Sequence, residues 1–510
     1  MTAVKRSLAL ACLVAVALTP AAAKATPSLP LGHAGRWITD AHGRVLIVHG
    51  TNMVYKLAPY YPQAIGFDAD DAAFLRSIGF DAVRVGVLWQ AVEPRPGVYD
   101  DGYLSQIAAT VRTLARYGIV SLLDFHQDQY NQRFQGEGFP DWSVQDDGLA
   151  PEPQLGFGAD YVGMPALERA FDHFWEDSAG PGGVGLQERY AAAWRHVAQR
   201  FAGNRNVLGY ELMNEPWPGS IWSSCAQTQG CPTFDTGPFA AFYHLAIGAI
   251  RKADRRTLIW YEPQVLFNYG SATNLPPLGD PRLGFAFHDY CLQFNFTGAT
   301  TSCPTLDDTV FANALARVAK TSDALMETEF GATTNPQVLV PAVQRADQKM
   351  VSWLEWAYCG CNDPTTSGPG AQQAIVLDPK KPPTGSNLNL PTLRVLVEPY
   401  PQLIAGTPLA WAFNSTSQTF TLKYSTARAS GHGSFGRGAV TQVATPAFVY
   451  AGRYAVRVSG GAILSRRGAS LLQIGACRHA KSVTVIVTRS GRSHGSCRLG
   501  ARAGRRRGSR

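Results

Sequence analysis

Eight short apolar segments, rich in β-branched and aromatic residues, alternate with amphipathic segments along the first two thirds of the chain. Strands that are apolar on both faces and separated by helices are typical of a parallel sheet covered by helices. Eight such units favour closure, which predicts an α/β fold with a (β/α)8 TIM barrel. The predicted strands are 45–53, 82–89, 119–126, 207–214, 257–261, 284–290, 324–330 and 350–358, and the helices include 70–78, 103–117, 186–201, 237–253 and 307–320.

The connection between the third and fourth predicted strands is far longer than the others. We expect this insertion, residues 130–180 of a barrel domain spanning 30–390, to leave the C-terminal face, where barrels bind substrates. Its core, 132–177, is interpreted as a loop region that shapes the substrate cleft. Aromatic residues such as Phe134, Trp142 and Phe157 argue against disorder, because disordered segments are poor in them.

The pattern changes after the eighth predicted strand. Residues 363–391 are rich in Pro, Gly, Ser and Thr, and short alternating runs follow at 409–413, 419–424, 447–450, 454–458, 471–474 and 482–487. This spacing predicts a small C-terminal antiparallel β-sandwich over residues 391–490. Few acidic residues or His clusters occur there, so no chemistry is assigned to it.

The first 25 residues have the order of a signal peptide: Lys5 and Arg6, an apolar run, and then small residues. A single-pass anchor is the alternative, but the apolar run is shorter than the roughly 20 residues that span a bilayer. The sequence therefore predicts a secreted protein. Eight Cys residues follow this segment, and an even number in an exported chain favours disulfides, whose connectivity the sequence leaves open.

The net charge of +8 invites a nucleic-acid interpretation, yet much of the excess lies in 498–510, including Arg505–Arg507, within a basic tail predicted over 491–510. A disordered, solvated tail is one explanation, and weak attachment to an anionic surface such as a membrane is the other. We expect no nucleic-acid partner, because this charge clusters in a tail and follows no recognition motif.

Two glutamates end predicted strands. Glu215, in Asn214–Glu215–Pro216, closes the fourth, and Glu329, in Thr328–Glu329–Phe330, closes the seventh. Hydrolysis of a β-glycosidic bond with retention needs two carboxyl groups about 5–5.5 Å apart, one protonated and one ionised. Strand ends of a barrel converge in space, so Glu215 and Glu329 are the candidate catalytic pair. Asn214 can hydrogen-bond a sugar 2-hydroxyl.

In these positions residues 36–360 resemble glycoside hydrolase family 5, whose clan carries its two catalytic Glu on strands four and seven. The resemblance implies that Glu215 is the acid/base and Glu329 the nucleophile. The resemblance adds Arg84, which can keep Glu329 ionised, and Tyr290, which can donate a hydrogen bond to it. Desolvation and the charge of Glu329 are expected to raise the pKa of Glu215. Further substrate contacts expected from the family pattern are His126, His288 and Trp356. For Arg84 an ordinary barrel salt bridge, and for Trp356 core packing, are the plainer alternatives.

Within this family the chain is most similar to endoglycoceramidases and related glycosphingolipid glycosidases. The similarity rests on Gly50–Asn52 with Lys56, on 123–130, on Trp260–Pro263, on 328–333 and on 353–358. It implies that Lys56, Asp128 and Asn214 contact the sugar and that an apolar surface beside the cleft receives ceramide. We also expect the protein to contact the membrane surface in which such a substrate lies.

The alternatives differ in substrate or in catalytic competence. A family 5 β-glucanase or β-glucosidase, acting on polysaccharide, steryl or other glucosides, would keep both glutamates. A non-catalytic carbohydrate or membrane-surface binder would be free to lose one of them. No metal is expected, because His126 and His288 lack metal-ligand spacing. We expect no cofactor and a monomer.

Overall fold

In the computed structural model, which describes residues 27–361, 365 and 373–499, eight parallel strands close into a barrel. Every residue of these strands is buried, because one face lines the barrel and the other lies beneath helices. The strands are β4 (His49–Met53), β5 (Ala82–Val87), β6 (Val120–Phe125), β7 (Val207–Glu211), β8 (Leu258–Tyr261), β9 (Leu283–Asp289), β10 (Ala324–Phe330) and β11 (Ser352–Glu355). The predicted barrel is confirmed, and its strands are shorter than predicted at several ends.

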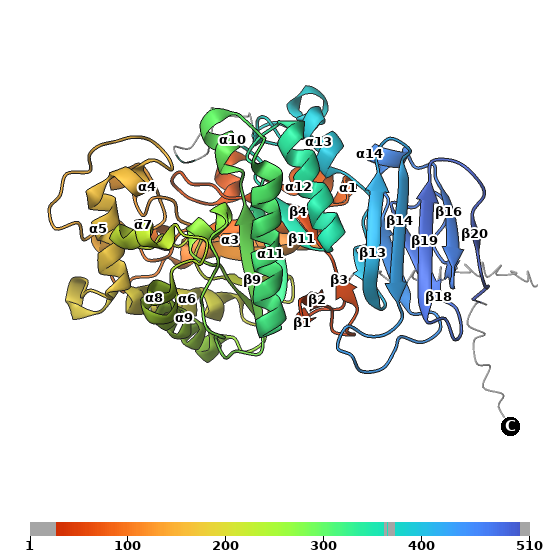
Figure 1. Ribbon diagram of the computed structural model, residues 1–510, viewed down its shortest axis with the longest axis horizontal. Helices are drawn as coiled ribbons and strands as arrows, with labels where there is room; N and C mark the ends of the chain where they lie inside the picture. The colour runs from red at the N-terminus through yellow and green to blue at the C-terminus, as the bar shows by residue number, and fades with distance from the viewer. Residues whose placement is uncertain (1–26, 362–364, 366–372, 500–510) are drawn as a thin grey trace, which may run out of the picture.

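Helices follow the strands and cover the barrel (Figure 1). They are α1 (Ala69–Ser77), α2 (Trp89–Val92), α3 (Asp101–Arg116), α4 (Asp160–Gly163), α5 (Pro165–Trp175), α6 (Leu186–Phe201), α7 (Trp222–Cys225), α8 (Pro232–Phe234), α9 (Ala240–Ala253), α10 (Leu292–Thr297), α11 (Cys303–Thr321), α12 (Pro336–Lys349) and α13 (Leu390–Leu396). Local chemistry sets their starts: Asp100 accepts a hydrogen bond from the backbone N–H of Tyr103, 2.9 Å away, and caps α3. Among the described residues, no helix is both long and apolar enough to cross a membrane.

The lower interior of the barrel is filled by Trp260. A Cβ at Gly209 or Gly284 would lie only 2.2 or 2.3 Å from its ring, so both strands need glycine at the point of closest approach. Leu31, Ile38 and Leu46 join the same core from the N-terminal strands and cover the N-terminal end of the barrel.

The C-terminal region forms two sheets packed face to face, and the predicted sandwich is confirmed. One sheet pairs β13 (Thr407–Asn414), β14 (Thr419–Ser425), β19 (Ser482–Thr488), β16 (Ala455–Ser459) and β20 (His494–Gly495). The other has the order β1 (Gly32–Ala34), β2 (Trp37–Thr39), β3 (Val45–Leu46), β12 (Leu403–Ile404), β15 (Val440–Ala444), β18 (Leu471–Ala476) and β17 (Gly461–Ile463). Strands β1–β3 therefore belong to this second sheet, which the sequence did not predict.

Two local predictions were wrong. The run 447–450, predicted as a strand, is the short helix α14 (Ala447–Tyr450) after Pro446, and the neighbouring strand is β15. A four-residue apolar run has no periodicity that separates the two states. The insertion 132–177, predicted as a loop, contains α4 and α5. Helix α5 buries Leu167, Phe171 and Phe174 at helical spacing, a pattern hidden by the surrounding Gly, Pro and Asp.

The chain ends bear on two further predictions. The tail predicted to be disordered begins at residue 491, and the structure describes it up to residue 499. In this first part β20 pairs with β16 and Cys497 forms a disulfide with Cys477, so the first part of the tail is ordered. The rest of the tail and the signal peptide 1–25 lie outside the described residues. The disulfides join sequence neighbours: Cys225–Cys231, Cys291–Cys303, Cys359–Cys361 and Cys477–Cys497.

Candidate active site

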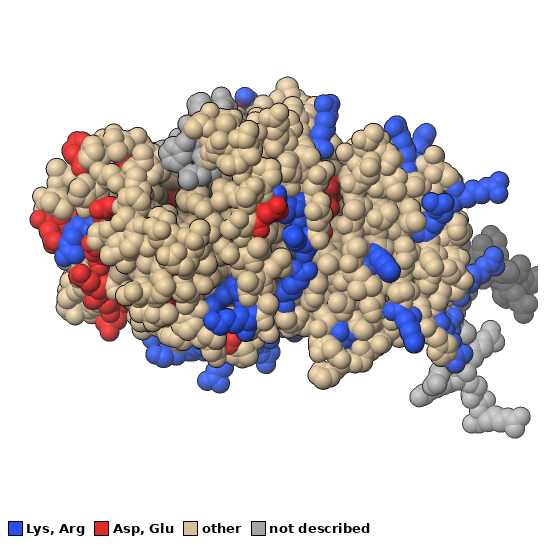
Figure 2. All heavy atoms as spheres, in the orientation of Figure 1, with Lys and Arg blue, Asp and Glu red and all other residues tan. Residues whose placement is uncertain are grey.

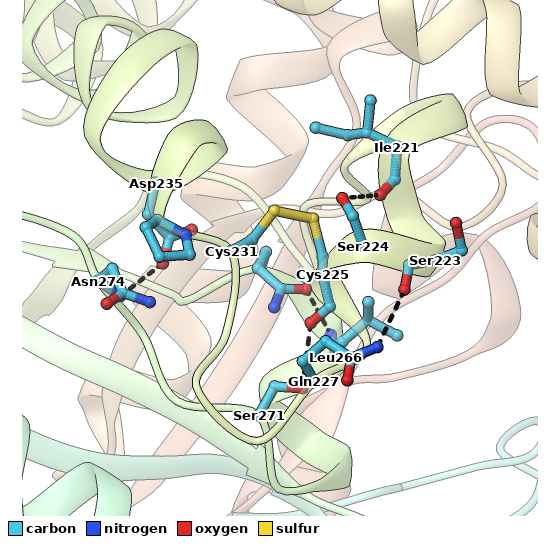
Figure 3. The surroundings of a disulfide bond; sticks show 12 residues. Ile221, Ser223, Ser224, Cys225, Gln227, Cys231, Asp235, Leu266, Ser271 and Asn274 are labelled. Carbon is cyan, nitrogen blue, oxygen red and sulfur yellow. Dashed lines mark hydrogen bonds between the residues drawn. A yellow bond between two sulfur atoms is a disulfide. The ribbon is translucent and has the colours of Figure 1, made fainter.

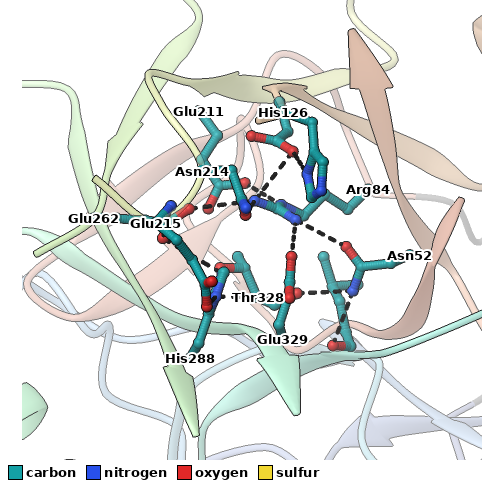
Figure 4. Close-up of polar contacts among 12 residues, drawn as sticks. Asn52, Arg84, His126, Glu211, Asn214, Glu215, Glu262, His288, Thr328 and Glu329 are labelled. Carbon is teal, nitrogen blue, oxygen red and sulfur yellow. Dashed lines mark hydrogen bonds and ion pairs between the residues drawn. The ribbon is translucent and has the colours of Figure 1, made fainter. Parts of the chain in front are cut away.

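A buried arginine organises the C-terminal end of the barrel. Arg84 on β5 is fully buried, and its guanidinium contacts four carboxylates (Figure 4). Its Nε lies 2.5 Å from Glu211 and its Nη2 lies 3.1 Å from Asp124 and 3.2 Å from Glu262, while Nη1 contacts Glu329. Burial lowers the pKa of Arg84, but the carboxylates more than offset this and hold it well above its ordinary value.

The same guanidinium also donates to two amide oxygens, Oδ1 of Asn214 at 2.8 Å and Oδ1 of Asn52 at 3.1 Å. The sequence predicted a contact between Arg84 and Glu329, which is present, and gave no sign of the other three carboxylates. Arg84 is therefore more than an isolated salt bridge, because it fixes side chains from several strands around one point.

Glu215 lies just beyond β7 with its backbone in the left-handed region, at φ 42°. Its N–H donates to Oε2 of Glu262 at 3.0 Å, which anchors this uncommon conformation. Its side-chain Oε1 accepts a hydrogen bond from Nδ2 of Asn268 at 2.7 Å and lies 2.8 Å from Nδ1 of His288. Both contacts hold the carboxyl group in one place.

Burial raises the pKa of Glu215 to about 7, and the nearby charge of Asp128 adds to the rise. The sequence named Glu329 as the charged neighbour, whereas Asp128 is the largest charge contribution. The cations His126, Arg84 and Lys56 oppose the shift. Near neutral pH, Glu215 can therefore both hold and release a proton.

Glu329, near the end of β10, faces Glu215. The Tyr290 hydroxyl donates to its Oε2 at 2.9 Å, and Arg84 contacts its Oε1. One oxygen of Glu329, one oxygen of Glu215 and a nitrogen of His288 all lie within 4.8 Å of one another. Carboxyl groups this close fit a retaining glycosidase, because an inverting enzyme holds its two carboxyl groups about 6.5–9.5 Å apart.

His288 lies beneath the two glutamates and is completely buried. Burial lowers its pKa to about 4, so the ring is neutral near pH 7. Its Nδ1 is 3.6 Å from Glu329 and its Nε2 is 3.5 Å from Glu262. The structure therefore places His288 against carboxylates of the site.

A second polar cluster lies beside the first and contains the other predicted residues. Lys56 Nζ contacts Asp128, donates to Oγ1 of Thr365 at 3.0 Å, and lies 3.6 Å from Glu137. The same nitrogen lies 4.6 Å from the centre of the Trp356 ring. These contacts fix the orientation of Lys56 at the edge of the site.

His126 connects the two clusters. Its ring stacks on Trp356, with ring centres 5.4 Å apart, and its Nδ1 lies 2.7 Å from Asp124. Burial and Lys56 lower the pKa of His126, but Asp124 and Asp128 more than offset this and raise it to about 9. Although burial raises the pKa of Asp128, Lys56 and His126 hold it well below its ordinary value. Asp128 is therefore an ionised acceptor between two cations.

All ten residues singled out in the sequence meet in this one region. Residues that the sequence analysis missed are Asn52, Asp124, Glu137, Glu211, Glu262 and Asn268. Asp124 had a detectable signal, because it lies two residues before His126 in the predicted strand 119–126, where alternate residues share a face. Asn268 had none, because it comes from the short helical segment Val265–Tyr269 after β8.

Several triads here have atoms that could coordinate a metal within 4.8 Å, including His126–Asp128–Glu137 and Glu211–Glu262–His288. Lys56 and Arg84 already contact the carboxylates of these triads. The positive charges of Lys56 and Arg84 therefore already neutralise these carboxylates, as a bound metal ion would.

The loop after Glu215 is tied down on one side (Figure 3). The Cys225–Cys231 disulfide closes it, the Ser271 hydroxyl donates to the Cys225 carbonyl at 3.3 Å, and the Asn274 N–H donates to Asp235 at 2.5 Å. These bonds join the loops after β7 and β8, which carry Glu215 and Asn268. Glu215 and Asn268 are thereby held in position relative to each other.

Comparison with known proteins agrees with this geometry. Residues 39–362 match the family described as Cellulase (glycosyl hydrolase family 5), and residues 399–488 match the Glycoside hydrolase family 5 C-terminal domain. Endoglycoceramidase I of Rhodococcus hoagii (strain 103S) is 31% identical over 480 residues, 92% of this chain and 90% of that protein. Endo-glycoceramidase II from Rhodococcus sp. superposes with a TM-score of 0.73 at 31% identity, over 89% of this chain and 99% of that one.

The complex of that second enzyme with ganglioside GM3 superposes with a TM-score of 0.72 at 29% identity, over 91% of this chain and 100% of that one. The matches cover both the barrel and the sandwich. The chain is a glycoside hydrolase and belongs to glycosyl hydrolase family 5.

Proposed function

We propose that this protein hydrolyses the β-glycosidic bond between a glycan and ceramide in glycosphingolipids, with retention of anomeric configuration. The observation that carries the proposal is the pair Glu215 and Glu329, with oxygens within 4.8 Å of each other. The glycolipid substrate is supported by similarity to endoglycoceramidases over nine tenths of the chain and by the GM3 complex of one relative.

The first step uses the two glutamates in opposite protonation states. Glu329 attacks the anomeric carbon, and the glycosidic C–O bond breaks as Glu215 gives its proton to the departing ceramide oxygen. The contacts from Arg84 and Tyr290 stabilise the Glu329 carboxylate before attack and orient one oxygen toward the sugar. The product of this step is a glycosyl ester on Glu329 and free ceramide.

The second step reverses the proton transfer. Glu215, now ionised, takes a proton from a water molecule as that water attacks the same anomeric carbon, and the ester bond to Glu329 breaks. A pKa of about 7 suits a group that must act first as an acid and then as a base near neutral pH. Asn214, held by Arg84, is proposed to bind the sugar 2-hydroxyl. Lys56, Asp128, His126 and Trp356 are proposed to line the sugar-binding side.

The test compares wild type with Glu329→Gln and Glu215→Gln on lactosyl-, glucosyl- and galactosylceramide in detergent, with products identified by thin-layer chromatography and mass spectrometry. Glu327→Gln is the matched control, because Glu327 is a buried glutamate in the same strand whose carboxyl oxygens lack hydrogen-bond partners among the described residues. Intact ceramide and free sugar from wild type and control alone support the proposal. Cleavage of β-glucan or steryl glucoside, with every ceramide glycoside untouched, would reject the lipid substrate in favour of a family 5 glucanase or glucosidase.

An aryl glycoside with a good leaving group separates the two glutamates. Its departure needs no proton, so Glu215→Gln should still release the aryl group and accumulate glycosyl-enzyme, whereas Glu329→Gln should not. Mass analysis of the intact protein detects that intermediate. Equal loss of aryl release in both variants would contradict the assigned roles.

We also propose that the protein is exported, acts as a monomer and works at a lipid surface. The signal-peptide pattern of residues 1–25 supports export. Fractionation of the producing cells and light scattering of the purified protein test the first two points.

A further inference from the structure

The sandwich domain has an extreme charge composition. Residues 399–499 contain two Lys, ten Arg and no Asp or Glu, so this domain carries more positive charge than the tail after it. Eleven of these twelve side chains are exposed, and none forms an ion pair within the described part of the chain. In Figure 2 the sandwich shows blue and no red, while red gathers at the opposite end of the molecule around α5.

Five of the arginines lie in three turns that meet at one end of the sandwich. Tyr454 O–H donates to the Ala469 carbonyl at 2.6 Å, so the turns before β16 and before β18 are in contact. The Val456 N–H donates to Oγ of Ser493 at 3.0 Å, which adds the turn after β19. This end, the arginine end, comprises the exposed residues Arg453, Arg466, Arg467, Arg489 and Arg492.

Two exposed apolar side chains belong to the same end. Phe448 on α14 and Leu464 after β17 are each 41% exposed. Helix α14 leads into the turn of Arg453, and Leu464 begins the turn that holds Arg466 and Arg467. Arginines mixed with an exposed aromatic and an exposed leucine are the composition that binds an anionic lipid interface, since the guanidinium groups meet head groups and the apolar groups enter the boundary below.

The arginine end points the same way as the catalytic end of the barrel. Helix α10 directly follows β9, so it marks the side of the barrel where the strands end and the candidate active site lies. Helices α10, α13 and α14 all lie toward the upper edge of Figure 1, and basic side chains gather at the upper right in the same view in Figure 2. The arginine end and the catalytic end of the barrel therefore lie toward the same side of the molecule.

We propose that the arginine end of the sandwich, with Phe448 and Leu464, docks the enzyme on anionic lipid membranes with its active site turned toward the surface. The inference rests on the proposed function in one respect, because it explains how a substrate embedded in a membrane is reached. Docking itself requires no glycolipid. A nucleic acid is a poorer partner, because an exposed Phe448 and Leu464 gain nothing from a phosphate backbone.

The test uses the full chain and vesicles without glycolipid, made of phosphatidylcholine with or without phosphatidylglycerol, and measures co-sedimentation. One variant replaces an arginine in each turn, Arg453→Ser, Arg467→Ser and Arg492→Ser. Each basic side chain near an anionic surface contributes about fivefold in binding, so this variant should lose on the order of a hundredfold. Wild type should bind only the anionic vesicles and be released by high salt.

The matched control removes the same charge from the opposite end of the sandwich strands. There the Thr426 N–H donates to the Lys481 carbonyl, and Arg437, Arg478 and Lys481 are exposed. Arg437→Ser, Arg478→Ser and Lys481→Ser should reduce vesicle binding less than about tenfold, since these groups lie away from the docked surface. Cleavage of a soluble aryl glycoside should be unchanged in both variants, which shows that the fold and the site are intact.

Three results would overturn the proposal: wild type that ignores anionic vesicles, equal losses in the two triple variants, or retention by duplex DNA at a salt concentration that abolishes vesicle binding. The last would assign the arginines to a nucleic acid. Because the vesicles contain no substrate, ceramide release is measured separately, with glycosylceramides in detergent. Vesicle binding without ceramide release in that assay would uphold docking and reject the proposed hydrolysis, whereas ceramide release without vesicle binding would reject docking alone.

Discussion

Glu262→Ala tests how the backbone of Glu215 is held. Glu262 Oε2 accepts the Glu215 N–H at 3.0 Å, and its Oε1 lies 3.2 Å from Arg84. Removing the acceptor leaves that N–H without its partner and frees Glu215 to leave the left-handed region. A donor left without its partner costs about 1–3 kcal/mol, so loss of positioning should lower kcat roughly 5- to 150-fold. Because Glu262 acts through Glu215 and not on the substrate, KM should change little.

Glu262→Gln is the conservative control for this experiment. Burial, followed by the charge of Glu211, raises the pKa of Glu262 well above its ordinary value, so an amide resembles the protonated side chain. The amide oxygen can still accept the Glu215 N–H, and we expect kcat to recover to within about tenfold of wild type. The assay is steady-state hydrolysis of an aryl β-glycoside, with kcat and KM fitted separately. Wild-type kcat in the alanine variant, or an equal loss in both variants, would refute the positioning role.

Three other predictions follow from the structure. Because the pKa of Glu215 is raised to about 7, kcat/KM on a substrate with a poor leaving group should fall above about pH 7, and this alkaline limb should vanish in Glu215→Gln; a limb unchanged in that variant would assign it to another group. Burial raises the pKa of Asp347 to about 7, so the folded protein keeps a proton that the unfolded chain releases above about pH 4. The free energy of unfolding therefore falls as the pH rises through about 7. Asp347→Asn should therefore lose about 2–4 kcal/mol less unfolding free energy than wild type between about pH 5 and pH 8 in urea titrations, and an equal loss in both proteins would assign the pH dependence to other groups. Replacing Cys477 and Cys497 by serine opens a loop with a sequence separation of 20 residues and should cost about 3 kcal/mol in unfolding of the sandwich, whereas an unchanged midpoint would show that this bond does not constrain the unfolded chain.

Much of the barrel could be predicted from local pattern. Runs such as 82–87 and 120–125 are buried on both faces and separated by amphipathic helices, and this periodicity is a property of neighbouring residues. Helix α5 and helix α14 escaped prediction for opposite reasons. The first is hidden among Gly, Pro and Asp residues, and the second is too short to show a period.

The candidate site divides in the same way. Glu215 and Glu329 could be named because each ends a predicted strand in a recognisable motif, and strand ends converge in any barrel. Glu211 and Glu262 could not, since their importance comes from a shared contact with Arg84 across 127 and 178 residues of sequence. The pairing of β3 with β12 is similarly a contact between segments far apart in the sequence.

The sequence by itself thus determined the fold class and the two glutamates, since each is a matter of residue type and short-range order. Only the tertiary structure decided which charges meet. It placed Asp128 near Glu215, four carboxylates around Arg84 and five arginines in three adjoining turns. The physical reason is that electrostatic effects and hydrogen bonds depend on distance and burial, which the chain acquires only on folding.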